Sequence, residues 1–377
     1  MNLSIISWME SGRYIYSLLK DKYEFKYVVE ENPEYWGVDA CTPEITVVSI
    51  GKAFELYQKG KINKFLIPCL RSKNAYTSIY LPLLERGVKS EDVLYAPFRI
   101  FRDKTLTDTE KSDLICRYED STDLELLVLH IVDHCNLCCA HCSMFSGLVK
   151  SPAFADYDKT ERAVLQLKMF FDQIMVFRLI GGEPLLNKDI GRYCKMIRRI
   201  YPLALIEIVT NALLIISLSD EIISILQEND ITLDITLYPL MASKIDEINE
   251  FLNEKKIRHY ITQERDSFLT LHDISGSANA KKNFENCSFK FNCVNMKENH
   301  IAGCFAPFAF PRVNSYFDLG INVTGAINLF SPGLSAKKLK AAMNQPHNLC
   351  KYCHIDDTEK WRELLPNEIY DKKSWSI

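Results

Sequence analysis

Four cysteines lie close together in the stretch Asp133–Ser143. Three of them, Cys135, Cys139 and Cys142, have the spacing C-x3-C-x2-C. Soft thiolates bind iron, and a short loop lets three sulfurs converge on one iron–sulfur cluster. Three thiolates on a four-iron cluster leave one iron without a protein ligand. That iron is open to a small molecule, as the open position of a catalytic metal site is.

The same stretch has two other interpretations. His134 and His141 are available to bind zinc together with the cysteines, because Cys/His clusters of short spacing are typical of zinc sites. Buried cysteines without any metal are the remaining interpretation. The cysteine motif alone therefore leaves iron–sulfur, zinc and packing open.

The elements around the loop favour the first interpretation. The apolar run Leu124–Val132 predicts a buried strand, and the cysteine loop follows it directly. A helix is expected from about Lys159 to Gln173, and a second strand at Phe177–Ile180. Gly181-Gly182-Glu183-Pro184 comes directly after that strand. In a parallel β/α barrel, segments that follow the strands share the catalytic face.

A C-x3-C-x2-C loop after a first strand, with GGEP after a second, resembles the radical S-adenosylmethionine (SAM) superfamily. The resemblance implies a [4Fe-4S] cluster held by Cys135, Cys139 and Cys142, with SAM chelating the open iron. It also implies that one electron splits SAM into methionine and a 5′-deoxyadenosyl radical, which takes hydrogen from a substrate. A donor such as flavodoxin or ferredoxin would supply the electron. The family pattern does not use Cys138, which we expect to point away from the cluster.

The resemblance also assigns residues to SAM. His141 occupies a position that is usually aromatic and faces adenine, and Glu183 the position of the acid that meets the SAM ammonium. Glycines at 181 and 182 let backbone come close to the cofactor, which a Cβ would block. Thr210 and Asn211 end the next strand, although Thr-Asn also opens ordinary turns. The expected SAM-binding residues are His141, Gly181, Gly182, Glu183, Pro184, Thr210 and Asn211.

A second cysteine set lies near the C-terminal end of the sequence. It comprises Cys287, Cys293, Cys304 and the C-x2-C pair Cys350 and Cys353. Its spacing resembles the auxiliary-cluster domains called SPASM or twitch, with Asn299 in the place of a glycine. The resemblance implies one auxiliary [4Fe-4S] cluster, with Cys293 as the spare thiol or the rival of Cys287. Zinc held by four cysteines is the alternative. The expected ligands are Cys287, Cys304, Cys350 and Cys353.

Composition narrows the class of protein. The 377 residues are 47% hydrophobic and 25% charged, as in ordinary globular proteins. A net charge of −4 and the lack of a basic run argue against nucleic acid. No apolar run is long enough to span a membrane, and the start lacks the features of a signal peptide. The 13 cysteines are therefore expected to stay reduced in the cytoplasm and to favour metal binding over disulfides.

The expected fold class is α/β with three parts. Residues 1–120 alternate strands and helices and resemble a Rossmann-like domain, but lack its glycine fingerprint, so a nucleotide site has little support. Residues 97–122 are polar and read as the linker. Residues 124–270 repeat a β/α rhythm that resembles the partial, six-stranded radical SAM barrel. Residues 271–377 are expected to form the small auxiliary-cluster domain.

Three functions remain open at this point. The first is an enzyme that takes hydrogen from a sugar, cyclitol or nucleotide-linked sugar, giving oxidation, dehydration or epimerisation. The second is a radical SAM enzyme that modifies a peptide or matures another enzyme. The third is a zinc-stapled interaction protein without catalysis. The sequence does not identify the catalytic residue, and Tyr238 is one candidate base among several.

Overall fold

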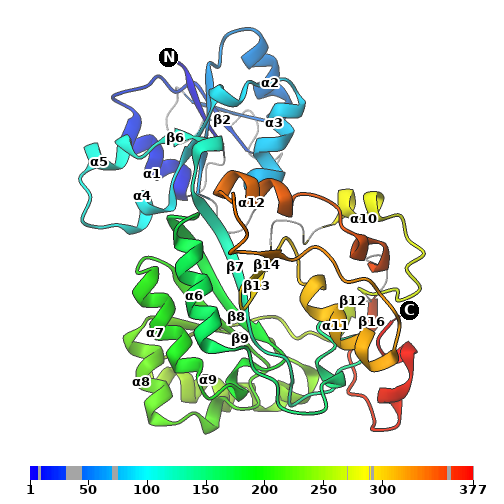
Figure 1. Cartoon of the computed structure of the whole chain (residues 1–377). Coiled ribbons are helices and arrows are strands. Elements are labelled where there is room, and N and C mark those ends of the chain that lie inside the picture. Colours follow the sequence, from blue (N-terminus) through cyan, green and yellow to red (C-terminus); the bar gives the residue numbers. More distant parts are fainter. Residues whose placement is uncertain are drawn as a thin grey trace. The chain divides into compact units, whose positions relative to one another are not determined.

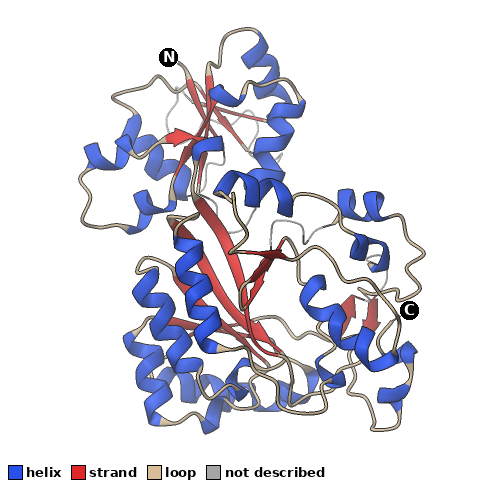
Figure 2. Cartoon of the chain, viewed as in Figure 1, coloured by secondary structure: helices blue, strands red, loops and turns tan. Residues whose placement is uncertain are grey.

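The structure is a computed structural model that describes residues 1–6, 10–30, 45–69, 75–269, 271–287, 289, 293–354 and 358–376, without the side chains of residues 77 and 78. It divides into two compact units, Met1–Glu125 and Leu126–Ile377. Figures 1 and 2 show that both are mixtures of helices and strands. Cys41 lies outside the described residues.

The first unit is built on a six-stranded sheet in the order β3-β2-β1-β4-β5-β6. The first five of these strands are parallel, as the alternation of strands and helices predicts, and β6 is antiparallel. Buried apolar side chains from β1, α1, β2 and β4 form its core. The elements are β1 Leu3–Ile6, α1 Glu10–Leu19, β2 Tyr27–Val29, β3 Thr46–Val48, α2 Ile50–Gln58, β4 Lys64–Pro68, α3 Leu81–Glu85, β5 Val93–Ala96 and β6 Cys116–Arg117.

Residues 97–122, expected as a linker, carry secondary structure of their own. Helix α4 covers Phe98–Arg102 and α5 covers Asp108–Asp113. Thr107 caps α5 and Glu110 reaches back to it, which is the reciprocal capping box. Since β6 pairs with β5, this stretch completes the edge of the first sheet.

The second unit repeats strand and helix from β7 onward. Strands β7 to β11 lie side by side in chain order, and β8, β9, β10 and β11 pair in parallel. Figure 1 shows helices α6 to α9 together on one side of this sheet. The elements are β7 Asp123–Val132, α6 Tyr157–Lys168, β8 Gln173–Gly181, α7 Ile190–Ile200, β9 Leu205–Thr210, α8 Asp220–Glu228, β10 Ile231–Ile235, α9 Ile245–Glu254 and β11 Arg258–Ile261.

Local sequence explains these helices. Asp156 caps α6 by accepting from the Lys159 backbone N–H, and Ser219 caps α8 in the same way. Helix α7 buries one apolar face, in which Cys194 is fully buried and packs as a small hydrophobic residue. The helices therefore cover one face of the sheet and leave the other face to the site.

Residues 271–377 continue the same sheet. Strand β13 pairs in parallel with β7, joining Val294 to Leu127, and β14 and β15 follow antiparallel. The sheet ends at β11 and β15 among the described strands, so this is a partial barrel and not a closed one. The remaining elements are β12 Ser267–Leu269, α10 Ala280–Asn286, β13 Val294–Lys297, β14 His300–Ala302, α11 Ala306–Phe317, β15 Ile327–Asn328, α12 Ala336–Met343 and β16 Thr358–Lys360.

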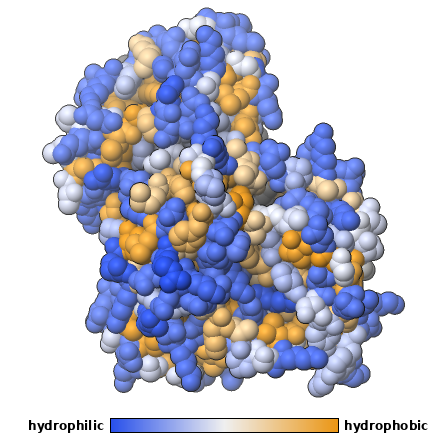
Figure 3. Space-filling view, in the orientation of Figure 1, coloured by the Kyte–Doolittle hydropathy of each residue, from blue (hydrophilic) through white to orange (hydrophobic). Residues whose placement is uncertain are grey.

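A hydrophobic cluster holds the cysteine loop against the C-terminal region. Phe145, Phe310 and Trp375 are fully buried in it. The face of the molecule in Figure 3 is mainly hydrophilic, with apolar residues in scattered groups, as is usual for globular proteins. No helix in the described ranges is both long and apolar enough to cross a lipid bilayer.

Candidate active site

A cavity of about 430 Å³ lies where the ends of β8 and β9 meet the cysteine loop. The three cysteines of the C-x3-C-x2-C motif, Cys135, Cys139 and Cys142, line it. Of the residues expected to bind SAM, all but Pro184 also line it; Pro184 is buried at the start of the following turn. The residues concerned are His141, Gly181, Gly182, Glu183, Thr210 and Asn211.

The thiols of this loop differ in their partners. The Sγ atom of Cys135 accepts from the Leu137 backbone N–H at 3.4 Å, and that of Cys139 from the Trp361 indole at 3.3 Å. Burial raises the pKa of Cys135 to about 12 and raises that of Cys139. Both would therefore stay protonated unless a metal or cluster displaces the protons.

The fourth thiol of the loop has a different environment. Cys138 does not line the cavity and packs against the hydrophobic cluster of Phe145, Phe310 and Trp375. A Cβ on Gly147 would lie 2.5 Å from the Cys138 Sγ atom, so this glycine makes room for the thiol. Three of the four cysteines of the loop are therefore in position to bind a cluster in the cavity.

The donor set fits a four-iron cluster better than a zinc ion. Within the described ranges, no three His, Cys, Asp or Glu side chains are close enough to hold one metal ion. A cube places each ligand on a separate iron, so its sulfurs stand further apart than around one ion. His134 Nδ1 faces the Ala153 backbone N–H at 3.0 Å, and His141 Nε2 lies 3.1 Å from a Glu359 carboxylate oxygen. One ring nitrogen of each imidazole is thus engaged with another part of the protein.

Glu183 is the buried acid of the cavity, at 1% exposure. Its carboxylate accepts from the Thr210 hydroxyl at 2.8 Å, the Asn211 N–H at 2.9 Å and the Leu185 N–H at 3.0 Å. Burial raises the pKa of Glu183 to about 7, although these hydrogen bonds favour the charged form. A cationic group in the cavity would compensate for the lost hydration of this carboxylate.

Thr210 and Asn211 are therefore brought into the site mainly as partners of Glu183. The Asn211 side chain also donates to the Asn136 side chain at 2.8 Å and lies 3.7 Å from the Cys135 Sγ atom. The end of β9 thus holds both the acid and the cysteine loop.

The two glycines of GGEP serve the protein's own backbone. A Cβ on Gly181 would lie 1.9 Å from the Val132 carbonyl oxygen, and one on Gly182 would lie 2.0 Å from the His134 carbonyl oxygen. The N–H groups of Gly182 and Glu183 donate to these same two carbonyls at 3.1 Å. Only glycine lets the end of β8 lie this close to the start of the cysteine loop.

Aromatic residues form the wall nearest β12. Tyr238 lines the cavity, is stacked on Trp361 at 5.5 Å between centroids, and meets Phe268 edge-on at 5.8 Å. Arg265 also lines the cavity and is exposed. Burial raises the pKa of Tyr238 well above its ordinary value, so its hydroxyl keeps its proton.

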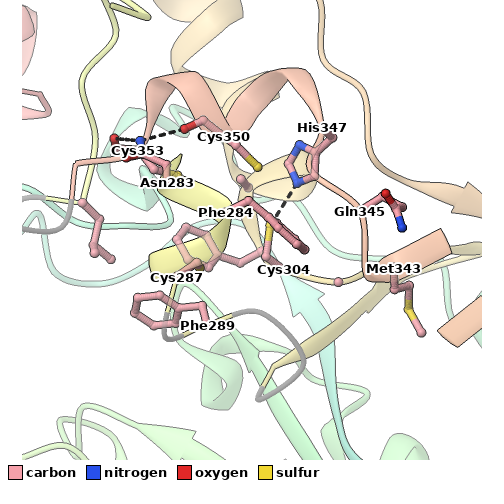
Figure 4. A pocket seen from close by; sticks show the side chains of 14 residues that line it. Asn283, Phe284, Cys287, Phe289, Cys304, Met343, Gln345, His347, Cys350 and Cys353 are labelled. Atoms are coloured by element: carbon pink, nitrogen blue, oxygen red, sulfur yellow. Dashed lines mark hydrogen bonds between the residues drawn. The ribbon is translucent and has the colours of Figure 1, made fainter. Parts of the chain in front are cut away.

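The second cysteine set surrounds a separate pocket (Figure 4). The expected ligands Cys287, Cys304, Cys350 and Cys353 all line it, whereas Cys293 does not. His347 joins them, with its Nε2 atom 3.4 Å from the Cys304 Sγ atom. Among the described residues between Cys287 and Cys304, Glu298 has a positive φ of 48° and Asn299 does not, so Asn299 does not hold the left-handed conformation for which a glycine would be favoured.

Sequence reasoning missed three residues that the fold brings to these sites. Trp361, Arg312 and His347 are separated from their partners Cys139, Asp133 and Cys304 by 222, 179 and 43 residues. No local spacing pattern connects residues that far apart. For Trp361, the bridge between Glu363 and Cys139 is one contact that brings the indole to the cysteine loop.

Comparison with known proteins agrees with this site. Residues 129–260 match the family described as the Radical SAM superfamily. The chain therefore contains a radical SAM domain, and the cofactors of that family are a [4Fe-4S] cluster and SAM. A comparison with curated protein sequences found no match.

Solved structures with similarity to the chain include BtrN in complex with AdoMet and 2-DOIA, at 17% identity, 61% of this chain, 92% of BtrN and a TM-score of 0.41. Another is anSMEcpe with bound AdoMet and Cp18Cys peptide, at 18% identity, 36% of this chain and a TM-score of 0.29. This chain spans only 42% of anSMEcpe. A third is UDP-D-quinovosamine 4-dehydrogenase from Vibrio fischeri, at 16% identity and a TM-score of 0.23. The match covers 28% of this chain and 87% of the dehydrogenase chain.

Proposed function

We propose that this enzyme takes a hydrogen atom from a sugar, cyclitol or nucleotide-linked sugar and brings about its net oxidation. When bound, the cluster and SAM supply the 5′-deoxyadenosyl radical. The observation that carries the proposal is the second pocket, which four cysteines line within the same compact unit as the SAM cavity. Dehydration and epimerisation are the other outcomes open to the same radical.

The residues of the cavity bind and orient the cofactor and substrate. Cys135, Cys139 and Cys142 hold the cluster, and Glu183 accepts the SAM ammonium, whose charge offsets the burial of the carboxylate. The aromatic wall at Tyr238 and Phe268 offers flat apolar faces for the C–H face of a sugar ring or for adenine. A wall of this kind also excludes water from a reactive radical.

The second pocket supports a resident auxiliary cluster. Four thiolates would saturate it, so it would accept an electron from a substrate radical without binding the substrate. The substrate would lose one hydrogen atom to the 5′-deoxyadenosyl radical, one electron to this cluster and one proton to a base, giving a carbonyl from an alcohol. On this proposal residues 271–377 are a twitch-type region and residues 124–270 the barrel.

Two further parts of the proposal concern the electron donor and the cellular compartment. A flavodoxin or ferredoxin would reduce the cluster, and a reducing compartment such as the cytoplasm would keep the 13 cysteines free for metal. The 12 cysteines within the described ranges are all free thiols, as this requires.

The proposal is tested by anaerobic incubation of the reconstituted enzyme with SAM, dithionite and panels of cyclitols, nucleotide sugars and cysteine-containing peptides. Formation of 5′-deoxyadenosine that depends on a sugar or cyclitol, with a ketone product, is expected. Turnover with peptides alone would overturn the substrate class. Absence of 5′-deoxyadenosine both with and without the candidate substrates would overturn the radical chemistry.

Two cysteine variants test the auxiliary cluster. Cys353→Ala is expected to lose about four irons per chain, one [4Fe-4S] cluster, and to stop product formation while SAM cleavage without substrate continues. Cys293→Ala is the matched control, because Cys293 is partly buried and does not line the pocket. Equal iron loss in both variants, or bound zinc in place of iron, would contradict the assignment.

A further inference from the structure

The segment Thr358–Leu364 lies against the cysteine loop through its backbone. The Ala140 N–H donates to the Arg362 carbonyl at 3.0 Å, and the Leu364 N–H donates to the Cys138 carbonyl at 2.7 Å. Cys139 and Glu363 form an antiparallel bridge between these two bonds. The position of this segment relative to the cluster ligands is therefore set by main-chain hydrogen bonds.

Trp361 projects from this segment toward a ligand sulfur. Its indole Nε1–H donates to the Cys139 Sγ atom at 3.3 Å. Stacking on Tyr238, with an angle of 25° between the rings, fixes one face of the indole. Its own backbone N–H donates to the Asp266 carbonyl at 2.7 Å, which fixes the start of the side chain. The indole is thus held in place from two directions.

We propose that Trp361 is a positioning residue that raises the reduction potential of the SAM-binding cluster through its hydrogen bond to Cys139. A reduced cluster carries more negative charge on its sulfurs than an oxidised one. An N–H donor to a ligand sulfur stabilises that extra charge and so favours reduction. Trp361 does this without adding a charge or a rival ligand, because an indole N–H donates only.

Of the other two thiols expected to hold this cluster, Cys135 has only a longer side-chain hydrogen bond, and Cys142 has none within the described ranges. The nearest case is Asn211 Nδ2, which lies 3.7 Å from the Cys135 Sγ atom and also donates to Asn136 at 2.8 Å. The Leu137 N–H that reaches Cys135 belongs to the loop backbone and would be present in any sequence. Trp361 therefore makes the shorter of the two side-chain hydrogen bonds to sulfurs at this cluster site in the described part of the chain.

The test compares Trp361→Phe with Trp375→Phe in reconstituted full-length enzyme. Phenylalanine keeps a ring against Tyr238 and removes only the N–H donor and part of the ring. Trp375 is a matched control, because its Nε1–H donates to the Ile369 carbonyl at 3.0 Å and not to sulfur. Redox titration followed by electron paramagnetic resonance would use the signal that changes when SAM is added, which identifies the cluster at the open-iron site.

A midpoint potential shifted to more negative values in Trp361→Phe, and unchanged in Trp375→Phe, is expected. An unshifted potential in Trp361→Phe, or an equal shift in both variants, overturns the proposal. If no SAM-sensitive signal exists in the wild-type protein, the radical SAM chemistry fails and not the role of Trp361 alone.

A second measurement needs no substitution and covers a variant that fails to hold iron. Wild-type enzyme labelled with ¹⁵N at the tryptophan indole nitrogen would be reduced and studied by electron–nuclear double resonance. A ¹⁵N coupling to the SAM-sensitive cluster is expected, because Nε1 of Trp361 bonds to a ligand sulfur. Its absence in wild-type enzyme overturns the proposal.

Discussion

The guanidinium of Arg312 lies 2.5 Å from the Asp133 carboxylate, although 179 residues separate them in the chain. The same guanidinium donates to the Met144 carbonyl at 2.5 Å. Asp133 and Met144 lie on either side of the cysteines of the loop, so one side chain on α11 ties the two ends of the loop together. Lys297 on β13 also binds Asp133, at 2.6 Å.

Arg312→Met should therefore loosen the cysteine loop. Arg312 is 7% exposed, and its removal leaves a half-buried carboxylate with Lys297 as its remaining cation. We expect the free energy of unfolding of the apoprotein to fall by about 2–3 kcal/mol, somewhat less than for a fully orphaned buried charge. Chemical denaturation measures this, and iron per chain should fall with it. Arg117→Met, which breaks the exposed pair with Asp120, should lower the free energy of unfolding much less, because exposed ion pairs contribute little; equal losses would contradict the role of Arg312.

The same contact predicts a pH dependence. Burial alone would raise the pKa of Asp133, but the charges of Arg312 and Lys297 outweigh burial and hold the pKa below its ordinary value of 3.8. A lowered pKa stabilises the fold above the pKa of the unfolded chain, and this stabilisation is lost as pH falls through the folded value. Wild-type protein should thus be more stable than Asp133→Asn at pH 6, and the gap should close below about pH 4 in denaturation curves. A constant gap would contradict the ion pair.

Gly182→Ala should displace the cysteine loop. The new Cβ would lie 2.0 Å from the His134 carbonyl oxygen and 2.8 Å from the Cys135 nitrogen, and backbone atoms cannot turn aside as a flexible side chain can. We expect most of the SAM-binding cluster to be lost, measured as iron per chain and as visible absorbance. Gly51→Ala is the matched control, because its Cβ would meet nothing nearer than 3.9 Å in helix α2. Full iron content in Gly182→Ala would refute this use of the glycine.

Glu183→Gln should weaken SAM binding by roughly 10–100-fold, the value of about one charge-assisted hydrogen bond. Since burial raises the pKa of Glu183 to about 7, its ionised fraction grows between pH 6 and pH 7.5. The affinity of wild-type enzyme for SAM should therefore increase over this range, and that of the variant should not. Anaerobic equilibrium binding measures both. A parallel increase in the two proteins would remove Glu183 from contact with the SAM ammonium.

Much of this site could be predicted from short stretches of sequence. The cysteine loop and GGEP each follow an apolar run, and parallel strands bring such segments to one edge, which is why Glu183 and Cys135 line one cavity. The parallel pairing of the first five strands of the first sheet follows from the alternation of strands and helices.

The rest depends on contacts between distant parts of the chain. Residues 294–297 are too short a run to reveal that β13 pairs with β7, and that pairing is what brings Lys297 to Asp133. The partner of each glycine in GGEP is also invisible in sequence, since nothing local indicates that Gly182 faces the His134 carbonyl. Side-chain partners such as Trp361 and Cys139 are fixed only once the whole unit has folded.

The pairing of residues 362–364 with residues 138–140 has a consequence for how the enzyme is made. A ribosome that has released the cysteines must add more than 200 residues before Trp361 can reach Cys139, which takes on the order of 10–50 seconds at ordinary elongation rates. During that time the ligand thiols are exposed to oxygen and to competing metals without the segment that covers them. The environment of the Cys139 sulfur is therefore completed only when the chain is nearly finished.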